Sequence, residues 1–316
     1  MNPEIEAINR IINNNLPSNV YDGVFNAADL INRQIEAIPC LLEPILPKVG
    51  LVGLAGSSDT GKSALLRQLA VSVCAGDNEF LGWHIKPEHK RAIYVSTEDD
   101  DLAISFLLNR LNKEKRLEPE QYSGLQFVFD TADLLNKLEN LLTIASVDLI
   151  IIDAFSDLYG RSMNDANQVR TFLNEYSQLA QKHRCLVIFL HHTGKRTEDL
   201  PPSKHNLLGS QGFEAKMRLV IELRNDHNEA DKRHLCIVKA NYLPKEFKTE
   251  SFVLQFSDNL LFANTNERRI FDELKPENKT ELKNTVKKLE IDGLTQMEIG
   301  RKLKISQTTV SRYLRE

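Results

Sequence analysis

Short apolar runs alternate with amphipathic segments through the middle of the chain. Five runs are apolar almost throughout, and they lie at 50–56, 91–96, 125–129, 148–153 and 185–192. Continuous runs of this length are typical of parallel strands that helices cover on both faces. Between them, apolar residues recur at helical spacing in 62–76, 99–114, 133–146 and 167–183. The pattern predicts an α/β fold with a mostly parallel sheet flanked by helices.

The pattern changes toward both ends of the chain. Residues 1–36 have helical spacing and predict an N-terminal helical segment, which the α/β core follows over 37–264. The later apolar runs of that core alternate more and have hairpin-like spacing, so we expect antiparallel strands at an edge of the sheet. These runs lie at 218–224, 234–242 and 251–257. Residues 265–290 indicate a linker or an exposed helix, and 291–316 a small helical domain.

Composition narrows the class of protein. The 316 residues are 41% hydrophobic and 27% charged, which is typical of a globular protein with a large core and a small appendage. No apolar run reaches the ~20 residues of a membrane span, and the N-terminal residues lack the layout of a signal peptide. The four cysteines form no CxxC pair, so we expect reduced thiols and a cytoplasmic protein without a membrane partner.

Charge is unevenly distributed, although the net charge is only −4. From Thr265 onward, 12 Lys and Arg accompany 9 Asp and Glu, a balance of +3, whereas the preceding residues carry −7. A basic tail on an acidic body is a weak indication that the tail has an anionic partner.

One motif indicates the chemistry. Residues 56–63, GSSDTGKS, match GxxxxGK[S/T] between a predicted strand and a predicted helix. Glycines let the backbone curl so that successive N–H groups point at phosphate oxygens, and the helix N-terminus adds partial positive charge. We expect Lys62 to reach the β- and γ-phosphates of ATP and Ser63 to bind Mg²⁺. The predicted ATP-binding residues are Gly56, Ser57, Ser58, Asp59, Thr60, Gly61, Lys62, Ser63 and Ala64.

Two acidic strand ends complete the expected site. Asp153 closes the run 148–153, and we expect its carboxylate to hold the Mg²⁺ shell next to Ser63. Glu98 follows the run 91–96, where a carboxylate can orient the attacking water. The neighbouring Asp100 and Asp101 suit a helix N-terminus, so we expect those two to cap a helix and Glu98 to act in catalysis.

The order of these motifs resembles that of the RecA-like ATPases, in particular the branch of the plasmid-type RepA hexameric helicases and their AAA_25-like relatives. The resembling segments are LLEPILPKVGLVGLAGSSDTGKS, FLGWHIKPEHKRAIYVSTEDD, DLIIIDAFSD, LVIFLHHTGK, LLGSQGFEAKMRLVIEL and IVKANY. They occur in the family's order over residues 39–262. The resemblance implies that Glu98 activates water and that His192 senses the γ-phosphate. From the residues alone, His191 and His192 are better explained as hydrogen-bonding residues at a strand end.

The resemblance also implies a homo-oligomer, a hexameric ring, in which a cation from the neighbouring subunit completes each catalytic site. The matching segments offer Arg218 and Lys239. Asn241 stands where some relatives carry an arginine, which leaves open which of the two cations acts, and Arg218 is our first choice.

Two loops are implied to face the central channel of such a ring, namely 157–167 and 193–210. The second contains Lys195, Arg196 and Lys204, which would contact the backbone of single-stranded DNA. Three cations in a polar loop suit an ordinary solvated loop equally well.

The last residues predict a helix-turn-helix. Thr295 and Ser306 are placed to cap two short helices whose apolar residues share one face. The outward side chains near the start of the second helix would meet base edges of duplex DNA, and Lys302 would contact phosphate. The predicted base-reading residues are Gln307, Thr308, Ser311 and Arg312. The segment resembles that of bacterial regulators, although Gly300 stands where alanine is usual. The alternative is a helical hairpin that packs on a neighbouring subunit.

Two classes of function remain open at this point. The first is a nucleic-acid motor, a DNA-stimulated ATPase of the helicase or helicase-loader type that serves a plasmid or another mobile element. The second is a regulator without motor activity, in which ATP controls assembly and the tail binds an operator or origin. We favour the motor.

Overall fold

The computed structural model describes residues 24–194, 197–208, 211–275, 279–303 and 305–315. The chain divides into two compact units, Met1–Ile38 and Pro39–Glu316. In the first unit the described part contains one short helix, α2 (Ala27–Asn32), which the side chain of Asn26 caps by accepting from the N–H of Asp29. The predicted helical positions before residue 24 lie outside the described residues. Among the described residues, no helix is both long and apolar enough to cross a membrane.

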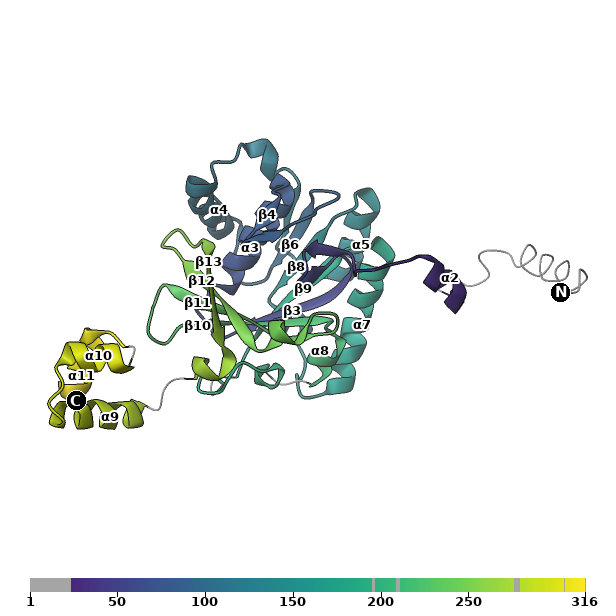
Figure 1. Cartoon of the computed structure of the whole chain (residues 1–316). Coiled ribbons are helices and arrows are strands. Elements are labelled where there is room, and N and C mark those ends of the chain that lie inside the picture. The colour runs from purple at the N-terminus through teal and green to yellow at the C-terminus, as the bar shows by residue number, and fades with distance from the viewer. Residues whose placement is uncertain (1–23, 195–196, 209–210, 276–278, 304, 316) are drawn as a thin grey trace, which may run out of the picture. The chain divides into compact units, whose positions relative to one another are not determined.

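The second unit is built on a nine-stranded sheet in the order β13-β12-β11-β10-β3-β9-β8-β6-β7 (Figure 1). Its strands are β3 (Gly50–Gly56), β6 (Ala92–Ser96), β7 (Leu125–Val128), β8 (Leu149–Asp153), β9 (Leu186–His192), β10 (Leu219–Asn225), β11 (Lys232–Ala240), β12 (Glu250–Phe256) and β13 (Phe262–Ile270). The six strands from β10 to β7 are mutually parallel, which confirms the predicted α/β class.

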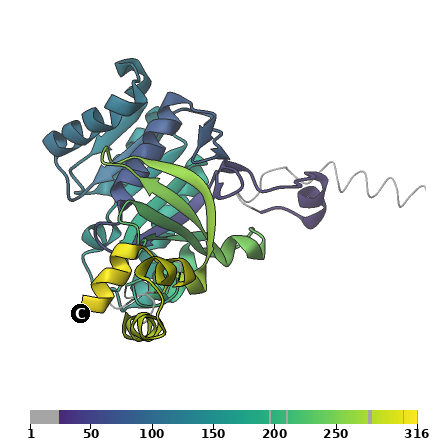
Figure 2. The ribbon, with the colours of Figure 1, turned by 60° about the vertical axis from the view of Figure 1, so that its left-hand side comes forward.

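The remaining three strands continue the sheet as antiparallel neighbours (Figure 2). The run at 218–224 differs from expectation, because β10 pairs in parallel with β3 and is antiparallel only toward β11. Sequence analysis also missed β13, whose outward side chains are mostly polar and exposed, as an edge strand permits. This strand runs past residue 264, where the sequence interpretation ends the ATPase core.

Helices cover both faces of the sheet (Figure 1). The apolar side chains of α3 (Lys62–Ala75) pack on one face, and those of α5 (Leu134–Ile144), α7 (Ala166–His183) and α8 (Gln211–Lys216) pack on the other. The helix α4 (Asp101–Lys115) joins α3 through a hydrogen bond from Lys115 to Ser72. The central strands are therefore buried on both sides, which explains their continuous apolar sequence.

Shorter elements complete the second unit. Two small ribbons pair β1 (Cys40–Leu42) with β2 (Leu46–Pro47) and β4 (Glu79–Phe80) with β5 (Trp83–His84). The one-turn helices are α6 (Phe155–Tyr159), η1 (Pro119–Tyr122), η2 (Lys204–Asn206), η3 (Lys245–Lys248) and η4 (Phe271–Leu274). The cysteines, all of which are described, form no disulfide, and each is buried except Cys40.

Three C-terminal helices surround a core of their own. They are α9 (Lys279–Ile291), α10 (Gln296–Leu303) and α11 (Gln307–Arg315), and their buried residues are Val286, Leu289, Ile299, Val310 and Tyr313. The predicted caps are present. Thr295 exchanges hydrogen bonds with Glu298, and the hydroxyl of Ser306 accepts from the N–H of Thr309. A Cβ atom on Gly300 would lie 2.8 Å from the carbonyl oxygen of Ile305, which explains why glycine replaces alanine there.

Candidate ATP site

The carboxyl ends of four parallel strands meet at one edge of the sheet, where open α/β sheets bind their ligands. Gly56 at the end of β3 lies opposite His192 at the end of β9, and Ser96 at the end of β6 lies opposite Asp153 at the end of β8. Strand β9 lies between β3 and β8. The fold thus brings together the phosphate loop, the metal candidate and both histidines.

The phosphate loop is fixed by the absence of side chains at its two glycines. A Cβ atom on Gly56 would lie 2.4 Å from the carbonyl oxygen of Leu223 on the neighbouring strand β10. At Gly61 the backbone has φ +87°, and a Cβ atom would lie 2.9 Å from the ring of Phe262. The loop therefore follows a path that only glycine allows at both positions. It leads directly into α3, whose N-terminus carries partial positive charge.

Lys62 is buried at the start of α3, and its ammonium group donates to the carbonyl oxygen of Ser57 at 2.6 Å. Burial lowers the pKa of Lys62, and the negative charges of Asp153 and Glu98 oppose that shift. The ammonium group thus lies on the loop itself. Phosphate oxygens can take the place of the Ser57 carbonyl as its acceptor.

Asp153 is buried beside the loop, and its carboxylate accepts a hydrogen bond of 2.5 Å from the hydroxyl of Tyr94. The same hydroxyl lies 3.5 Å from the carbonyl oxygen of Ser63, so Tyr94 links β6, β8 and α3. In the part of the chain that the structure describes, no group of three or more His, Cys, Asp or Glu could hold a metal ion by itself. Asp153 and Ser63 fit Mg²⁺ that arrives with its nucleotide, because Mg²⁺ commonly takes one or two protein ligands together with phosphate oxygens.

Glu98 lies at the mouth of the site, immediately after β6. The residue as a whole is exposed, but partial burial of its carboxyl group raises its pKa, and the charges of Asp153 and Asp157 raise it further. The neighbouring acidic residues have other partners. Asp99 pairs with Arg67 at 3.5 Å, and Asp100 caps α4 by accepting from the N–H of Ala103, as expected. Asp101 lies in the first turn of α4. Glu98 is therefore the carboxylate of this run that faces the site.

The two histidines at the end of β9 differ in their surroundings. His191 is fully buried between aromatic rings, and its Nε2 lies 3.0 Å from the carbonyl oxygen of Leu208, while its Nδ1 has no partner among the described residues. Burial lowers the pKa of His191 to about 4, so the ring is neutral at pH 7. His192 is half-buried, and burial together with the charge of Lys62 lowers its pKa. His192 is the one that borders the phosphate loop.

Comparison with known proteins agrees with this geometry. Residues 18–198, more than half of the chain, match the model of the AAA_25 family, which is described as an AAA domain. The chain belongs to the AAA_25 family. It is similar in structure to the solved ATPase domain of a helicase, with a TM-score of 0.58 and 15% sequence identity over 78% of this chain and 100% of that one. At that identity the likeness shows the fold. No curated protein matches the sequence. The chain is a RecA-like P-loop ATPase.

The antiparallel strands supply a second layer of support to the phosphate loop of this AAA_25 protein. Arg233 on β11 is buried, and its Nε donates to the carbonyl oxygen of Thr60 at 3.2 Å. Its guanidinium group lies over the ring of Phe256, 4.9 Å from the centroid, and that ring stacks on Phe262 next to Gly61. The loop is thus held from the side of the sheet that sequence analysis assigned to a peripheral edge.

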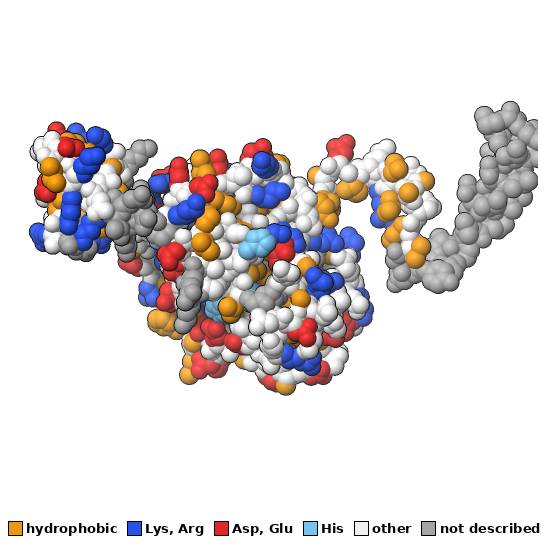
Figure 3. Space-filling view, turned by 90° about the horizontal axis from the view of Figure 1, so that it is seen from below, with side chains coloured by type: hydrophobic (Ala, Val, Ile, Leu, Met, Phe, Trp, Pro, Cys, Tyr) orange, Lys and Arg blue, Asp and Glu red, His pale blue; other side chains and the backbone are white. Residues whose placement is uncertain are grey.

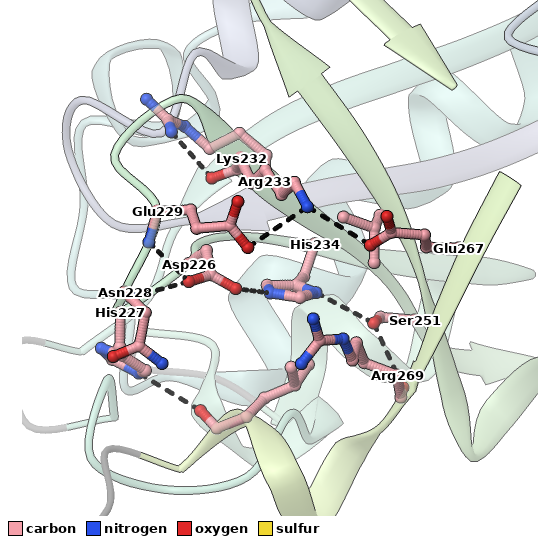
Figure 4. A network of polar contacts seen from close by, with 12 residues as sticks. Asp226, His227, Asn228, Glu229, Lys232, Arg233, His234, Ser251, Glu267 and Arg269 are labelled. Atoms are coloured by element: carbon pink, nitrogen blue, oxygen red, sulfur yellow. Dashed lines mark hydrogen bonds and ion pairs between the residues drawn. The ribbon is translucent and has the colours of Figure 1, made fainter. Parts of the chain in front are cut away.

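The hairpin that carries Arg233 is fastened by a buried polar network (Figure 4). Asp226 lies 2.8 Å from Nε2 of His234, whose Nδ1 lies 3.0 Å from the hydroxyl of Ser251. The order Asp–His–Ser matches a hydrolase triad, but Ser251 is fully buried and its hydroxyl lies 3.2 Å from the carbonyl oxygen of Arg269. The network therefore joins β10, β11, β12 and β13, and its serine is not accessible as a nucleophile.

The two cations predicted to act from a neighbouring subunit lie away from this site. Arg218 precedes β10 and packs beside Gly50, at the opposite end of β3 and about 20 Å from Gly56. Lys239 on β11 lies opposite Val220 at the same end, and its ammonium group contacts Glu214 at 2.6 Å through the carbonyl oxygen and 3.1 Å through the carboxylate. Neither cation reaches the phosphate loop of its own chain.

The predicted DNA-contacting residues fall in three places. Lys204 lies in η2 and pairs with Glu214 at 3.3 Å. Lys195 and Arg196 lie outside the described residues. The others lie in the C-terminal helices, where all are exposed except the half-buried Ser311; they are Lys302, Gln307, Thr308, Ser311 and Arg312.

Sequence analysis missed three polar residues that support the site. Tyr94 occurs in a strand of otherwise aliphatic residues, and a lone tyrosine that is fully buried needs a partner for its hydroxyl, which was the available signal. Thr97 lies between Asp153 and Asp157 and bonds both, and Arg233 reaches the loop from a strand 173 residues later in the chain. No local pattern indicates either contact.

Proposed function

We propose that this ATPase is a nucleic-acid motor, a DNA-stimulated enzyme of the helicase or helicase-loader type that works as a ring, a hexamer, and serves a plasmid or another mobile element. The observation that carries the proposal is the course of β9. This strand ends beside the phosphate loop at His192 and continues directly into the basic loop that contains Lys204. A change at the γ-phosphate and a polynucleotide on the loop would therefore act on the same segment of chain.

In the proposed reaction Lys62 and the loop N–H groups bind the β- and γ-phosphates of ATP, and Ser63 and Asp153 hold Mg²⁺. The metal supplies charge neutralisation at the transferring phosphoryl group. Glu98 orients the attacking water from the mouth of the site, and its raised pKa favours accepting a proton from that water. His192, neutral and next to the loop, is placed to hydrogen-bond the γ-phosphate.

A second cation, placed opposite the lysine of the phosphate loop, is worth 10³–10⁵ in the rate of phosphoryl transfer. We propose that Arg218 of a neighbouring copy supplies it, with Lys239 beside it. The N–H of Asn241 donates to the carbonyl oxygen of Arg218 at 3.3 Å, so these two residues are neighbours at one sheet edge. Arg218 can thus occupy the place of the arginine that some relatives carry at the position of Asn241.

Exposed apolar side chains support self-assembly. On α4, Leu102 and Phe106 lie one helical turn apart and are 75% and 64% exposed. Large apolar side chains that share a helix face on the surface are typical of interaction sites.

The C-terminal helices favour an additional duplex contact and keep the second candidate function open, a regulator in which ATP controls assembly. A surface hollow of about 500 Å³ on these helices is lined only by polar and basic side chains, namely Gln296, Gln307, Thr308, Ser311, Arg312 and Arg315. Lys and Arg side chains recur over the visible surface of these helices (Figure 3). We propose that α10 and α11 act as a helix-turn-helix.

The motor is tested by ATP turnover of the full chain with and without single-stranded DNA, followed by strand displacement on a forked duplex. We expect single-stranded DNA to raise turnover, and displacement to require hydrolysable ATP. Turnover that is indifferent to single-stranded DNA, with duplex binding intact, would favour the regulator instead.

Assembly is tested by mixing two inactive variants. Lys62→Ala removes the phosphate contact and Arg218→Ala removes the cation in trans, so each should lose most of its turnover, roughly 10³-fold or more for the latter. Mixed rings contain interfaces in which both groups are intact, and we expect partial recovery of activity. Arg170→Ala, at an exposed position of α7, is the matched control and should retain full activity. A protein that is monomeric and fully active at every concentration contradicts the proposal.

The role of the tail is tested with point variants and a truncation. Arg312→Ala should weaken binding to a preferred duplex by about 1–3 kcal/mol if it contacts a base edge, whereas Lys302→Ala should weaken all duplexes alike. Truncation after Lys275 keeps β13 and should spare basal turnover. If truncation instead changes the oligomer size in size-exclusion chromatography and leaves duplex preference unchanged, the tail is a packing hairpin.

A further inference from the structure

Strand β10 carries two charged side chains inside the protein. Glu222 is 2% exposed and Arg224 is 7% exposed, and the guanidinium Nε lies 3.4 Å from the carboxylate. They are two residues apart on one strand, so both point to the same face of the sheet. Burying two ions costs several kcal/mol for each, and an apolar pair of similar volume would often be as stable. Stability alone therefore does not explain why charged residues occupy these positions.

Within the described part of the chain, the other side-chain hydrogen bonds of this Glu222–Arg224 pair go to one segment, the part of the basic loop over 197–206. The guanidinium group donates to the carbonyl oxygens of Thr197, Glu198 and Leu200 at 2.8, 2.8 and 2.6 Å. The carboxylate accepts from the N–H of Ser203 at 3.0 Å and from the side-chain amide of Asn206 at 3.2 Å. A segment whose only regular structure is η2 is thus held by charge-assisted bonds from a single strand.

The same loop is joined to the phosphate site at both of its ends. At its start, the N–H of Thr193 donates to the carbonyl oxygen of Gly56 at 3.3 Å. At its return, Leu208 accepts from the ring of His191 and donates to the carbonyl oxygen of His192.

Strand β10 adds a third link between the pair and the loop that binds phosphate. The carbonyl oxygen of Leu223, between the two charged residues, lies against Gly56. A cavity of about 220 Å³ separates the pair from Ser57 and Thr193 and leaves room for the segment to shift.

We propose that Glu222 and Arg224 are positioning residues that couple the nucleotide at the phosphate loop to the conformation of the basic loop. With ATP bound, the ends of the loop and the pair on β10 hold segment 197–206 in one arrangement. Hydrolysis changes the contacts at Gly56 and His192, and the pair transmits that change to the segment. The link to a polynucleotide rests on the proposed function, whereas the link between nucleotide and loop does not.

The experiment is limited trypsin digestion of the full chain with and without a non-hydrolysable ATP analogue and Mg²⁺, because Lys195, Arg196 and Lys204 are cleavage sites within the loop. We expect the analogue to slow loop cleavage of the wild-type protein roughly 5-fold or more, the lower end of typical coupling between sites. Glu222→Met/Arg224→Met removes both charges together, and should bind the analogue yet lose this protection. Lys115→Ala, which breaks an ion pair between α4 and the end of α3, is the control and should keep it.

Arg224→Lys covers the case in which the double variant fails to fold, because lysine keeps the charge but cannot hold three carbonyl oxygens at once. Its protection should fall well below that of the wild-type protein. Wild-type protection in either variant, or no protection in the wild-type protein itself, would overturn the inference. Protection that follows the nucleotide in a protein without DNA-stimulated turnover would support the coupling and contradict the motor.

Discussion

The ATP site depends on the close approach of two backbones at Gly56. No side chain fits there, because the carbonyl oxygen of Leu223 on β10 occupies the space that a Cβ atom would need. This contact fixes where β3 ends and where the phosphate loop begins to curl. Lys62, the N-terminus of α3 and the carboxylate of Asp153 take their positions from that starting point, since each lies on an element that follows β3 or belongs to the same sheet. A P-loop thus requires its neighbouring strand as much as its own residues.

The neighbouring strand also relates the two ends of the sheet. At the carboxyl end, β10 borders the phosphate loop and carries the pair of charges that holds the basic loop. At the opposite end, Arg218 and Lys239 lie about 20 Å from the site of their own chain. A sheet with catalytic groups at both ends is suited to head-to-tail assembly, in which one end of each copy faces the other end of the next. The proposed ring follows from this arrangement.

Most of the sheet and much of the site were predictable, because their signals are local. Residues 56–63 form a continuous motif, and Asp153 and Glu98 directly follow apolar runs that became β8 and β6. The contacts of Tyr94 and Arg233 were not predictable, because they depend on strand order and on strands that fold back beside the loop. Strand β13 was missed because its polar outer residues conceal the period-2 pattern of an edge strand. The roles proposed for Arg218 and for the loop at Lys204 depend on a second copy and on DNA, which lie outside any single chain.

The most direct test of the central claim is to measure ATP binding and ATP turnover separately in two variants of the full chain. Lys62→Ala should weaken Mg²⁺–ATP binding in a calorimetric titration, since it removes the buried cation that faces the phosphates. Glu98→Gln should bind Mg²⁺–ATP about as well as the wild-type protein and lose hydrolysis, because it keeps the shape of the side chain and removes the base. Turnover of Glu98→Gln at the wild-type rate, or unchanged binding by Lys62→Ala, would contradict this account of the site.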